Sequence, residues 1–94
     1  LGYRYNGMTV WNVPDSEIDR LGEQVGRLPF VSHCYHRPRH LPDWPYNLFA
    51  MVHSKTEAGV TEQIAAIADI LGEYNLGHEV LYSTKILKKT GLRI

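Results

Sequence analysis

Hydrophobic and polar residues follow two periodicities along this chain, and each periodicity predicts a type of element. Segments 3–13, 30–37, 46–53 and 79–87 are rich in β-branched and aromatic residues and predict four strands. In the first strand, alternation separates two faces: Thr9, Trp11 and Val13 on one, and Met8, Val10 and Asn12 on the other. The run PRHLPDWP between the second and third strands holds three prolines and predicts a stiff, shaped loop.

Two further segments carry apolar residues at the spacing of one helix face. The first, near 15–28, begins at the capping sequence PDSE, and the second, near 57–74, is ended by the Asn-Leu-Gly sequence at 75–77. The two apolar stripes are Ile18, Leu21, Val25 and Leu28, and Val60, Ile64, Ile67, Ala68 and Leu71. Gly22 and Gly26 weaken the first helix by about 1 kcal/mol each, so we expect close packing at these two positions.

The predicted order of elements is βαββαβ. This order favours an α+β fold of the ferredoxin-like type, a four-stranded antiparallel sheet with two helices on one face. The length of 94 residues fits one domain. Because the other sheet face has no helix to cover it, and such domains often pair sheet to sheet or bind a ligand there, we expect a dimer or a partner domain.

Composition narrows the classes of function. The formal net charge is zero, so there is no general attraction to nucleic acid. No apolar run approaches the roughly 18 residues of a membrane span, and one cysteine forms no internal disulfide, so we expect a soluble, cytoplasmic protein.

The chain begins LGYRYNG without an initiator methionine, which we interpret as a piece of a longer protein. Segment 56–79 has five acids and no Lys or Arg, while 33–40 has three histidines and two arginines, which favours a local anion site.

The stretch VSHCYHRPRHLPDWPYNLFAMVH, residues 31–53, concentrates the side chains that can do chemistry, including four of the five histidines. Alternation puts Val31, His33, Tyr35 and Arg37 on one face of the second strand, and Ser32, Cys34 and His36 on the other. In the third strand it separates Tyr46, Leu48, Ala50 and Val52 from Asn47, Phe49, Met51 and His53. Positions that face helices should be apolar, so we expect His33, Tyr35 and Arg37 to point away from the helices.

A metal site is one interpretation of this stretch, because His33, Cys34, His36 and His40 include common zinc ligands. The predicted strand argues against it, since His33 and His36 lie on opposite faces and Cys34 points away from His33. The same geometry disfavours a Cys–His nucleophile pair, and Cys34 is more often a small buried residue. A structural interpretation also stays open, in which the histidines are hydrogen-bonded strand residues and the two arginines are solvated edge charges.

Taken as a cluster, these side chains suit a flat, polyanionic, aromatic ligand. Arginine offers a bidentate fork for carboxylates. Histidine donates a proton near neutral pH, and tyrosine and tryptophan present flat apolar surfaces.

The same stretch, with GMTVW before it and LYSTKILKKT after it, closely resembles the siroheme decarboxylases. These enzymes are relatives of the Lrp/AsnC regulators and act in haem and d-type haem biosynthesis. The resemblance covers nearly the whole chain and implies one Lrp/AsnC-type ligand-binding domain over residues 1–94. The resemblance implies a winged-helix domain before it in the family, which we expect to lie outside these 94 residues. The implied reaction removes CO2 from two acetate side chains of siroheme to give didecarboxysiroheme.

The resemblance also implies roles for the clustered residues. Loss of CO2 leaves a carbanion-like methylene, so the protein must hold the carboxylates, exclude water and deliver a proton. His33 is the expected proton donor, and Tyr35 is expected to orient it or to donate in turn. The expected substrate-binding residues are Arg37, Arg39, Trp44, Tyr46 and Asn47. For Asn47 two roles are expected, fixing a carboxylate of the substrate or fixing the loop. No cofactor or protein-bound metal is expected beyond the iron of siroheme, with His33 or His36 as an axial iron ligand as the alternative.

Two other functions stay open. One is the effector-binding and oligomerisation domain of an Lrp/AsnC-type transcriptional regulator, although ordinary effector domains of that type bind small amino acids and have no need of an H-x-Y-x-R face. The other is a catalytically silent subunit that completes a decarboxylase dimer. The expected partners are siroheme and a second subunit, identical or paralogous, and nucleic acid is not expected to bind this domain.

Overall fold

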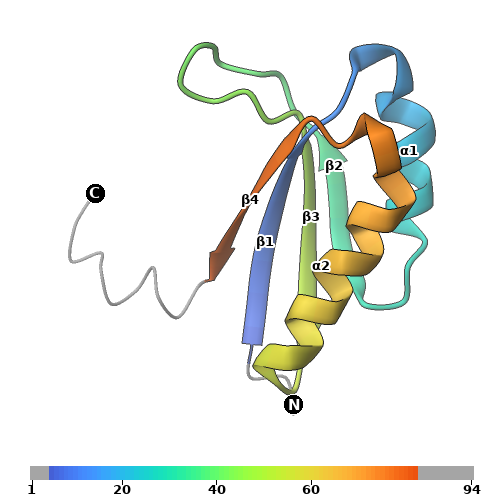
Figure 1. The fold of residues 1–94 in the computed structure, drawn as a ribbon, viewed down its shortest axis with the longest axis vertical. Helices are drawn as coiled ribbons and strands as arrows, with labels where there is room; N and C mark the ends of the chain where they lie inside the picture. Colours follow the sequence, from blue (N-terminus) through green and yellow to red (C-terminus); the bar gives the residue numbers. More distant parts are fainter. Residues whose placement is uncertain (1–4, 83–94) are drawn as a thin grey trace.

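The computed structural model describes residues 5–82, in which strands and helices follow the predicted order (Figure 1). The elements are β1 (Tyr5–Asn12), the 3-10 helix η1 (Asp15–Glu17), α1 (Ile18–Gly26), β2 (Val31–His36), β3 (Leu48–Ser54), α2 (Glu57–Leu71), the 3-10 helix η2 (Gly72–Tyr74) and β4 (Gly77–Tyr82). The end of the last predicted strand and the cationic tail lie outside the described residues.

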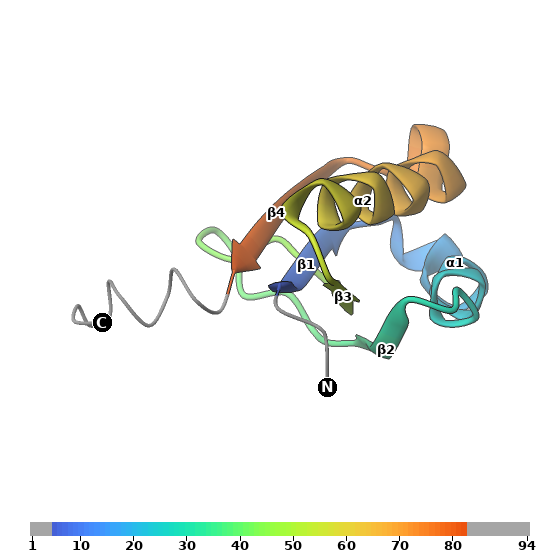
Figure 2. The same cartoon turned by 90° about the horizontal axis from the view of Figure 1, so that it is seen from below.

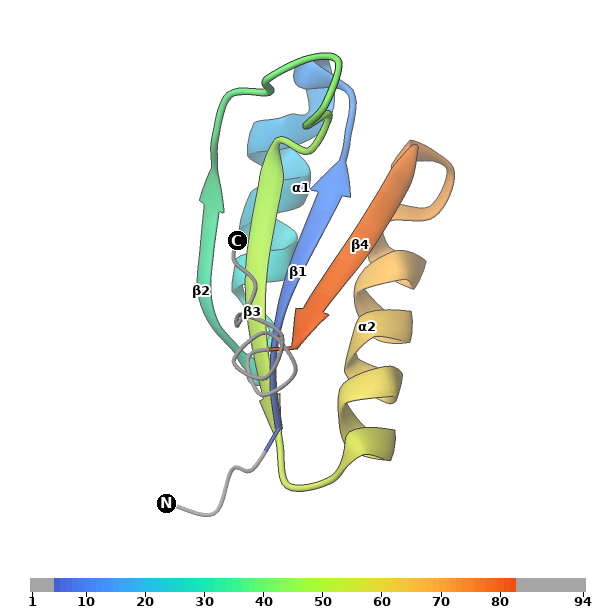
Figure 3. The same ribbon diagram turned by 90° about the vertical axis from the view of Figure 1, so that its left-hand side faces the viewer.

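The four strands form one antiparallel sheet in the order β2-β3-β1-β4. Both helices lie on the same side of it, behind the sheet in Figure 3, and the end-on view of Figure 2 shows the same arrangement. The ferredoxin-like α+β fold is therefore confirmed. We call the side without helices the open face; it carries Met8 and Val10 of β1, His33 and Tyr35 of β2, and Phe49, Met51 and His53 of β3. Within residues 5–82, neither helix is long and apolar enough to cross a bilayer.

The core fills the space between the sheet and the helices. The predicted helix stripes are confirmed, because their central members are buried together with inward-facing strand residues: Trp11, Ile18, Leu21, Val25, Leu48, Ala50, Val52, Val60, Ile67 and Leu71. Thr9 is the polar exception on this side of β1. Its hydroxyl accepts a hydrogen bond from Trp11 Nε1 at 2.8 Å and donates one to Ala50 O at 2.6 Å, so no polar atom of this group is left unpaired.

Local chemistry sets both ends of α2. Thr56 is its N-cap, and Oγ1 of Thr56 accepts a hydrogen bond from Gly59 N at 2.9 Å. Gly72 ends the helix with a φ of +53°, a conformation that favours glycine. The prediction that the α-helix continues to Tyr74 and stops at 75–77 is therefore corrected, because residues after Leu71 form η2 instead.

The expectation of close packing at the two glycines of α1 is not supported. A Cβ added at Gly22 would lie 3.4 Å from Leu48 Cδ1. A Cβ added at Gly26 would lie 3.5 Å from Cys34 Cβ. Both separations are ordinary contact distances, so the sheet leaves room for alanine at either position.

A β-bulge changes the faces predicted for the first residues of β2. Val31 pairs with Val52 and His33 pairs with Met51, so Ser32 is an extra residue on β2. Val31 consequently packs against the core on the helix side, while Ser32 shares the open face with His33. The predicted faces of Val31 and Ser32 are therefore wrong, because alternation assumes a strand without a bulge.

Candidate functional site

Strand β2 places His33 and Tyr35 on the open face, and Arg37 follows at the start of the loop. Tyr35 pairs with Phe49 of β3, and Arg37 N donates to Asn47 O at 2.9 Å, which continues the pairing beyond the strand. The side chains of this row are exposed to solvent. The prediction that they point away from the helices is confirmed.

Phe49 is the centre of an aromatic cluster on the open face. Tyr35 stacks on it, with ring centroids 5.7 Å apart and ring planes at 11°. The guanidinium of Arg37 lies 5.3 Å from the Phe49 centroid, a cation–π distance. Trp44 completes the cluster, with its ring centroid 6.1 Å from that of Phe49 and 5.1 Å from that of Tyr46, which it meets edge-on. The cluster therefore joins the loop to the central strands and orients Arg37.

A pocket of about 340 Å³ lies beside this cluster. Arg37, Pro38, His40, Trp44 and Phe49 line it. Two backbone hydrogen bonds between His40 and Trp44, both 2.7 Å long, hold the loop in shape. The pocket thus offers aromatic walls for a flat ring and a cation for a carboxylate.

Arg39 has contacts that differ from those predicted. Its guanidinium donates to Pro45 O at 2.9 Å and to Asn12 Oδ1 at 2.8 Å. It also donates to Val13 O at 2.7 Å and forms an ion pair with Asp15 at 2.6 Å. The hydrogen bond and charge of Arg39 hold the pKa of the Asp15 carboxyl below its usual value. Because its nitrogens donate within the chain, the geometry favours an anchor for the loop over the predicted carboxylate clamp.

Asn47 anchors the same loop from the end of β1. Its side chain is buried, and Oδ1 accepts a hydrogen bond from Val13 N at 3.0 Å. Nδ2 donates to Val13 O at 2.8 Å and to Asp15 Oδ1 at 3.2 Å. Of the two roles expected for Asn47, these contacts favour the support of the loop over a contact with a carboxylate ligand.

The phenol of Tyr46 lies beside the carboxylate of Glu79 on β4. Burial raises the pKa of the Tyr46 phenol, and the nearby Glu79 carboxylate raises it further. The phenol therefore stays protonated at neutral pH, where it can donate a hydrogen bond.

Cys34 and His36 lie on the helix side of β2. The Sγ of Cys34 donates to Gly22 O at 3.5 Å, and burial raises the pKa of the thiol, which keeps it protonated and weakly nucleophilic. His36 borders a shallow pocket with Ile18 of α1. The prediction that Cys34 and His33 lie on opposite faces is confirmed. Among the residues that the structure describes, no three His, Cys, Asp or Glu side chains are grouped closely enough to hold a metal ion.

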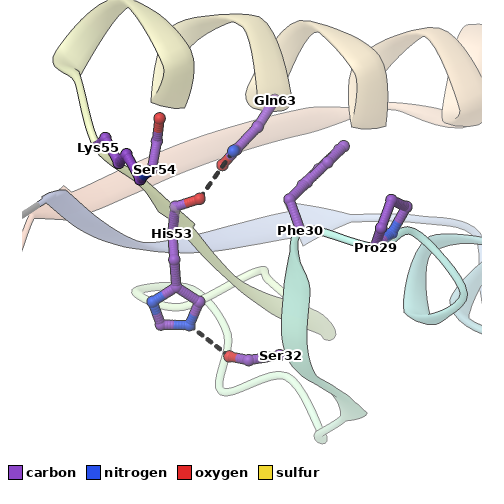
Figure 4. A pocket seen from close by; sticks show the side chains of 7 residues that line it. All are labelled: Pro29, Phe30, Ser32, His53, Ser54, Lys55 and Gln63. Atoms are coloured by element: carbon purple, nitrogen blue, oxygen red, sulfur yellow. Dashed lines mark hydrogen bonds between the residues drawn. The ribbon is translucent and has the colours of Figure 1, made fainter. Parts of the chain in front are cut away.

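Two residues that the sequence analysis left out of the site are joined to His33. Ser32 Oγ lies 3.1 Å from His33 Nδ1 and 2.5 Å from His53 Nε2. Ser32 and His53 also line a pocket of about 640 Å³ (Figure 4). The alternation of β3 already places His53 on one face with Phe49, which was a usable signal. No residue pattern marks the bulge that turns Ser32 toward them.

Comparison with known proteins identifies relatives of this chain. Residues 1–88 match a family model described as the AsnC-like ligand binding domain. The siroheme decarboxylase NirH subunit of Pseudomonas aeruginosa is 61% identical over 94 residues, which are 100% of this chain and 55% of that protein. The NirH subunit of Stutzerimonas stutzeri is 54% identical over 94 residues, with the same two coverages. The chain thus spans about half the length of the curated relatives it matches.

One solved structure combines the fold with a bound tetrapyrrole. It is the crystal structure of the siroheme decarboxylase NirDL in co-complex with an iron-uroporphyrin III analogue. The TM-score is 0.73 at 31% sequence identity, and the match covers 83% of this chain and 25% of that chain. The predicted resemblance to siroheme decarboxylases is confirmed by these relatives. From the matched residues, the chain belongs to the AsnC-like ligand binding domain family.

Proposed function

We propose that this chain is the ligand-binding domain of a siroheme decarboxylase subunit, which removes CO2 from two acetate side chains of siroheme to give didecarboxysiroheme. The observation that carries the proposal is the open face, where an exposed histidine, an exposed arginine and a cluster of aromatic rings share one surface. The names of the relatives, and the iron-uroporphyrin III analogue in the NirDL structure, support the same class of substrate.

His33 is the proposed proton donor. Loss of each CO2 leaves an electron pair on a methylene carbon beside the macrocycle, and each product carbon needs one proton. Ser32 engages Nδ1 of His33, so Nε2 is the nitrogen that would deliver the proton. Tyr35, next along the same face, is proposed to orient His33 or to donate a proton in turn, while Phe49 supports its ring.

Arg37 is the proposed clamp for a substrate carboxylate. It follows His33 by four residues, which is roughly 13 Å along an extended strand, so the two side chains reach different parts of one large flat ligand. Trp44 and Tyr46 are proposed to stack on the ring or border its edge. Arg39 and Asn47 contribute indirectly, because they hold the loop that carries Trp44 and Tyr46.

A second subunit is proposed to cover the open face. Decarboxylation leaves a reactive carbanion, so bulk water must be excluded from the site. No described helix shields this side of the sheet. The relatives are named as subunits, which supports a partner, identical or paralogous. We propose no cofactor besides the iron that the substrate carries, and a cytoplasmic location stays a prediction.

The mass of the product tests the proposal. The protein in its natural full-length form, alone and mixed with a paralogous subunit, is incubated with siroheme without oxygen, and the tetrapyrroles are analysed by mass spectrometry. The expected result is the loss of two CO2 from siroheme. Siroheme that binds but is recovered unchanged under both conditions would indicate the effector-binding domain of a regulator, and an absence of both binding and turnover would contradict the proposal.

Variants on the two faces of β2 test the division of roles. His33→Ala should slow product formation by a factor on the order of 10² to 10⁴ with little change in siroheme binding, as for the loss of a positioned acid. Arg37→Ala should weaken binding first, because a lost carboxylate clamp raises the dissociation constant. Cys34→Ser, on the helix side, is the control and should change neither. Absorption titrations and single-turnover rates separate these effects. Turnover at the wild-type rate by His33→Ala would contradict its role and would fit a silent subunit.

A further inference from the structure

A continuous chain of hydrogen bonds crosses three strands on the open face and ends at His33. Asn6 Oδ1 of β1 lies 2.6 Å from Nδ1 of His53 on β3. His53 Nε2 lies 2.5 Å from Ser32 Oγ on β2, and Ser32 Oγ lies 3.1 Å from His33 Nδ1. Figure 4 shows the His53 ring turned toward Ser32, away from the backbone carbonyl that Gln63 holds. The chain therefore links two imidazoles, the side chains that exchange protons near neutral pH, through one hydroxyl.

Backbone register builds this chain. In a regular strand the neighbours Ser32 and His33 would point to opposite faces, and the bulge puts both on the open face. Asn6 is the direct partner of His53 in the β1–β3 pairing. The four side chains are thus held by the pairing of three strands and not by a flexible loop.

The amide oxygen at one end sets the direction of the hydrogen bonds. Asn6 Oδ1 only accepts, so Nδ1 of His53 carries a hydrogen. In neutral His53, Nε2 then accepts from the Ser32 hydroxyl, and the Ser32 oxygen accepts from Nδ1–H of His33. Neutral His33 in this state has no hydrogen on Nε2 and cannot act as an acid there. We call this arrangement of hydrogens the discharged state of the hydrogen-bond chain, because His33 then has no proton to deliver from Nε2.

One proton added at Nε2 of His53 reverses the hydrogen bonds. Protonated His53 then donates to Ser32, and the Ser32 hydroxyl donates to Nδ1 of His33. For this His33 changes tautomer, giving up the hydrogen on Nδ1 and taking one on Nε2, so the charged state holds one proton more than the discharged state. When that Nε2–H bond breaks and a C–H bond forms on the substrate, the Ser32 proton moves to Nδ1 of His33 and the His53 proton moves to Ser32 Oγ. One proton has entered at His53 and one has left at His33, which restores the discharged state.

The proposed reaction needs such a route because it consumes two protons for each siroheme. While a flat ligand and a second subunit cover the open face, His33 has no direct path to solvent. His53 lies at the pocket of about 640 Å³, whose lining residues are distinct from those of the pocket at Arg37. Among the described residues that line the pocket at His53, the formally charged side chain is the exposed Lys55. Helix α2 contributes the neutral side chain of Gln63 to this lining.

We propose that His53 takes up protons at this pocket and passes them through Ser32 to His33, so that the second acetate is decarboxylated without release of the half-finished product. The inference rests on the proposed function, with His33 as the proton donor. It assigns His53 and Ser32 as positioning residues that act through His33.

The test measures how the product divides between the one-CO2 and two-CO2 stages in a single turnover of the full-length protein with its partner subunit. His53→Gln keeps a hydrogen-bonding amide near Ser32 but cannot cycle a proton, and Ser32→Ala breaks the chain. Both should raise the ratio of monodecarboxylated to didecarboxylated product by roughly tenfold or more, with the siroheme titration unchanged. Ser32→Thr keeps the hydroxyl and should restore much of the wild-type ratio. Ser54→Ala removes a hydroxyl from the same pocket outside the chain and should leave the ratio unchanged.

Three outcomes separate this inference from the proposed function. Didecarboxylated product from wild-type protein with an unchanged ratio in both His53→Gln and Ser32→Ala would overturn the relay alone. An equal loss of siroheme binding in both variants would also overturn it, because the residues would then serve structure. No product from the wild-type pair would overturn the proposed function, and the relay with it.

Discussion

Arg37 and Arg39 both carry a guanidinium group and lie two residues apart, but their guanidinium groups make different contacts. Arg37 is exposed over the Phe49 ring, where its donors can meet a ligand. The guanidinium of Arg39 donates hydrogen bonds to Pro45, Asn12, Val13 and Asp15. The difference comes from residues that are distant in sequence, so the local pattern R-P-R could not assign the two roles.

Asn47 offers a residue-scale prediction about this anchor. Asn47→Ala removes three hydrogen bonds and leaves the buried Val13 N–H without its partner, so the free energy of unfolding should fall by roughly 1–3 kcal/mol. Chemical denaturation followed by tryptophan fluorescence measures the change. Gln24→Ala, which removes an exposed amide from α1, is the control and should alter stability by less than about 0.5 kcal/mol. An equally small effect of Asn47→Ala would contradict the anchoring role.

At the scale of elements, two local features shape the surroundings of the site: the bulge in β2 and the tight turn before α2. The bulge in β2 adds one residue and thereby places Ser32 beside His33. Before α2, the cap at Thr56 brings Gly59 close to Ser54: a Cβ at Gly59 would lie 2.0 Å from Ser54 Oγ and 3.0 Å from Ser54 Cβ. The helix therefore begins where the chain is too tight for a side chain.

Two glycine-to-alanine substitutions test whether helix propensity or the contacts of the added Cβ decides the change in the free energy of unfolding. Propensity alone predicts a gain of about 1 kcal/mol for each. Gly22→Ala meets only ordinary contacts and should raise the free energy of unfolding by about 0.5–1 kcal/mol. Gly59→Ala collides with Ser54 and should lower it by about 1 kcal/mol or more. Thermal and denaturant unfolding of both variants give the comparison, and a stabilised Gly59→Ala protein would contradict the packing described for the start of α2.

At the scale of the molecule, the sheet has one covered and one open side, and the chemical side chains lie on the open one (Figure 3). Tyr35 keeps 41% of its surface exposed there, beside an aromatic cluster and the exposed imidazole of His33. A surface of this kind is typical of an interface or a ligand site. The fold thus presents its chemistry where a second subunit could close over it.

Association through this face is the prediction at this scale. The protein should form dimers at tens of micromolar in sedimentation or light-scattering measurements. Tyr35→Glu should abolish the dimer, because the substitution places a charge in an apolar contact that two copies share. Leu76→Glu, at a more exposed apolar residue in the η2–β4 turn, should leave the dimer intact. A monomeric wild-type protein, or dimers of Tyr35→Glu as stable as the wild type, would contradict an interface at the open face.

The sequence by itself determined the order of elements, the helix stripes and the face on which His33 and Tyr35 lie. These features depend on periodicity and local propensity, which neighbouring residues carry. The positions of Ile18, Leu21 and Val25 already predict a buried helix face, and the structure buries all three. The stretch at 31–53 also supplied most of the side chains of the candidate site, because those side chains are close in sequence.

Only the tertiary structure decided which of those side chains are available to a ligand. The bulge at Ser32 depends on how β2 pairs with β3, and the anchoring of Arg39 and Asn47 depends on the end of β1. His53 reaches Ser32 only because two strands that are separated by a loop pair in one register. Contacts of this kind join residues about 20 or more positions apart, and no local pattern of polar and apolar residues records them.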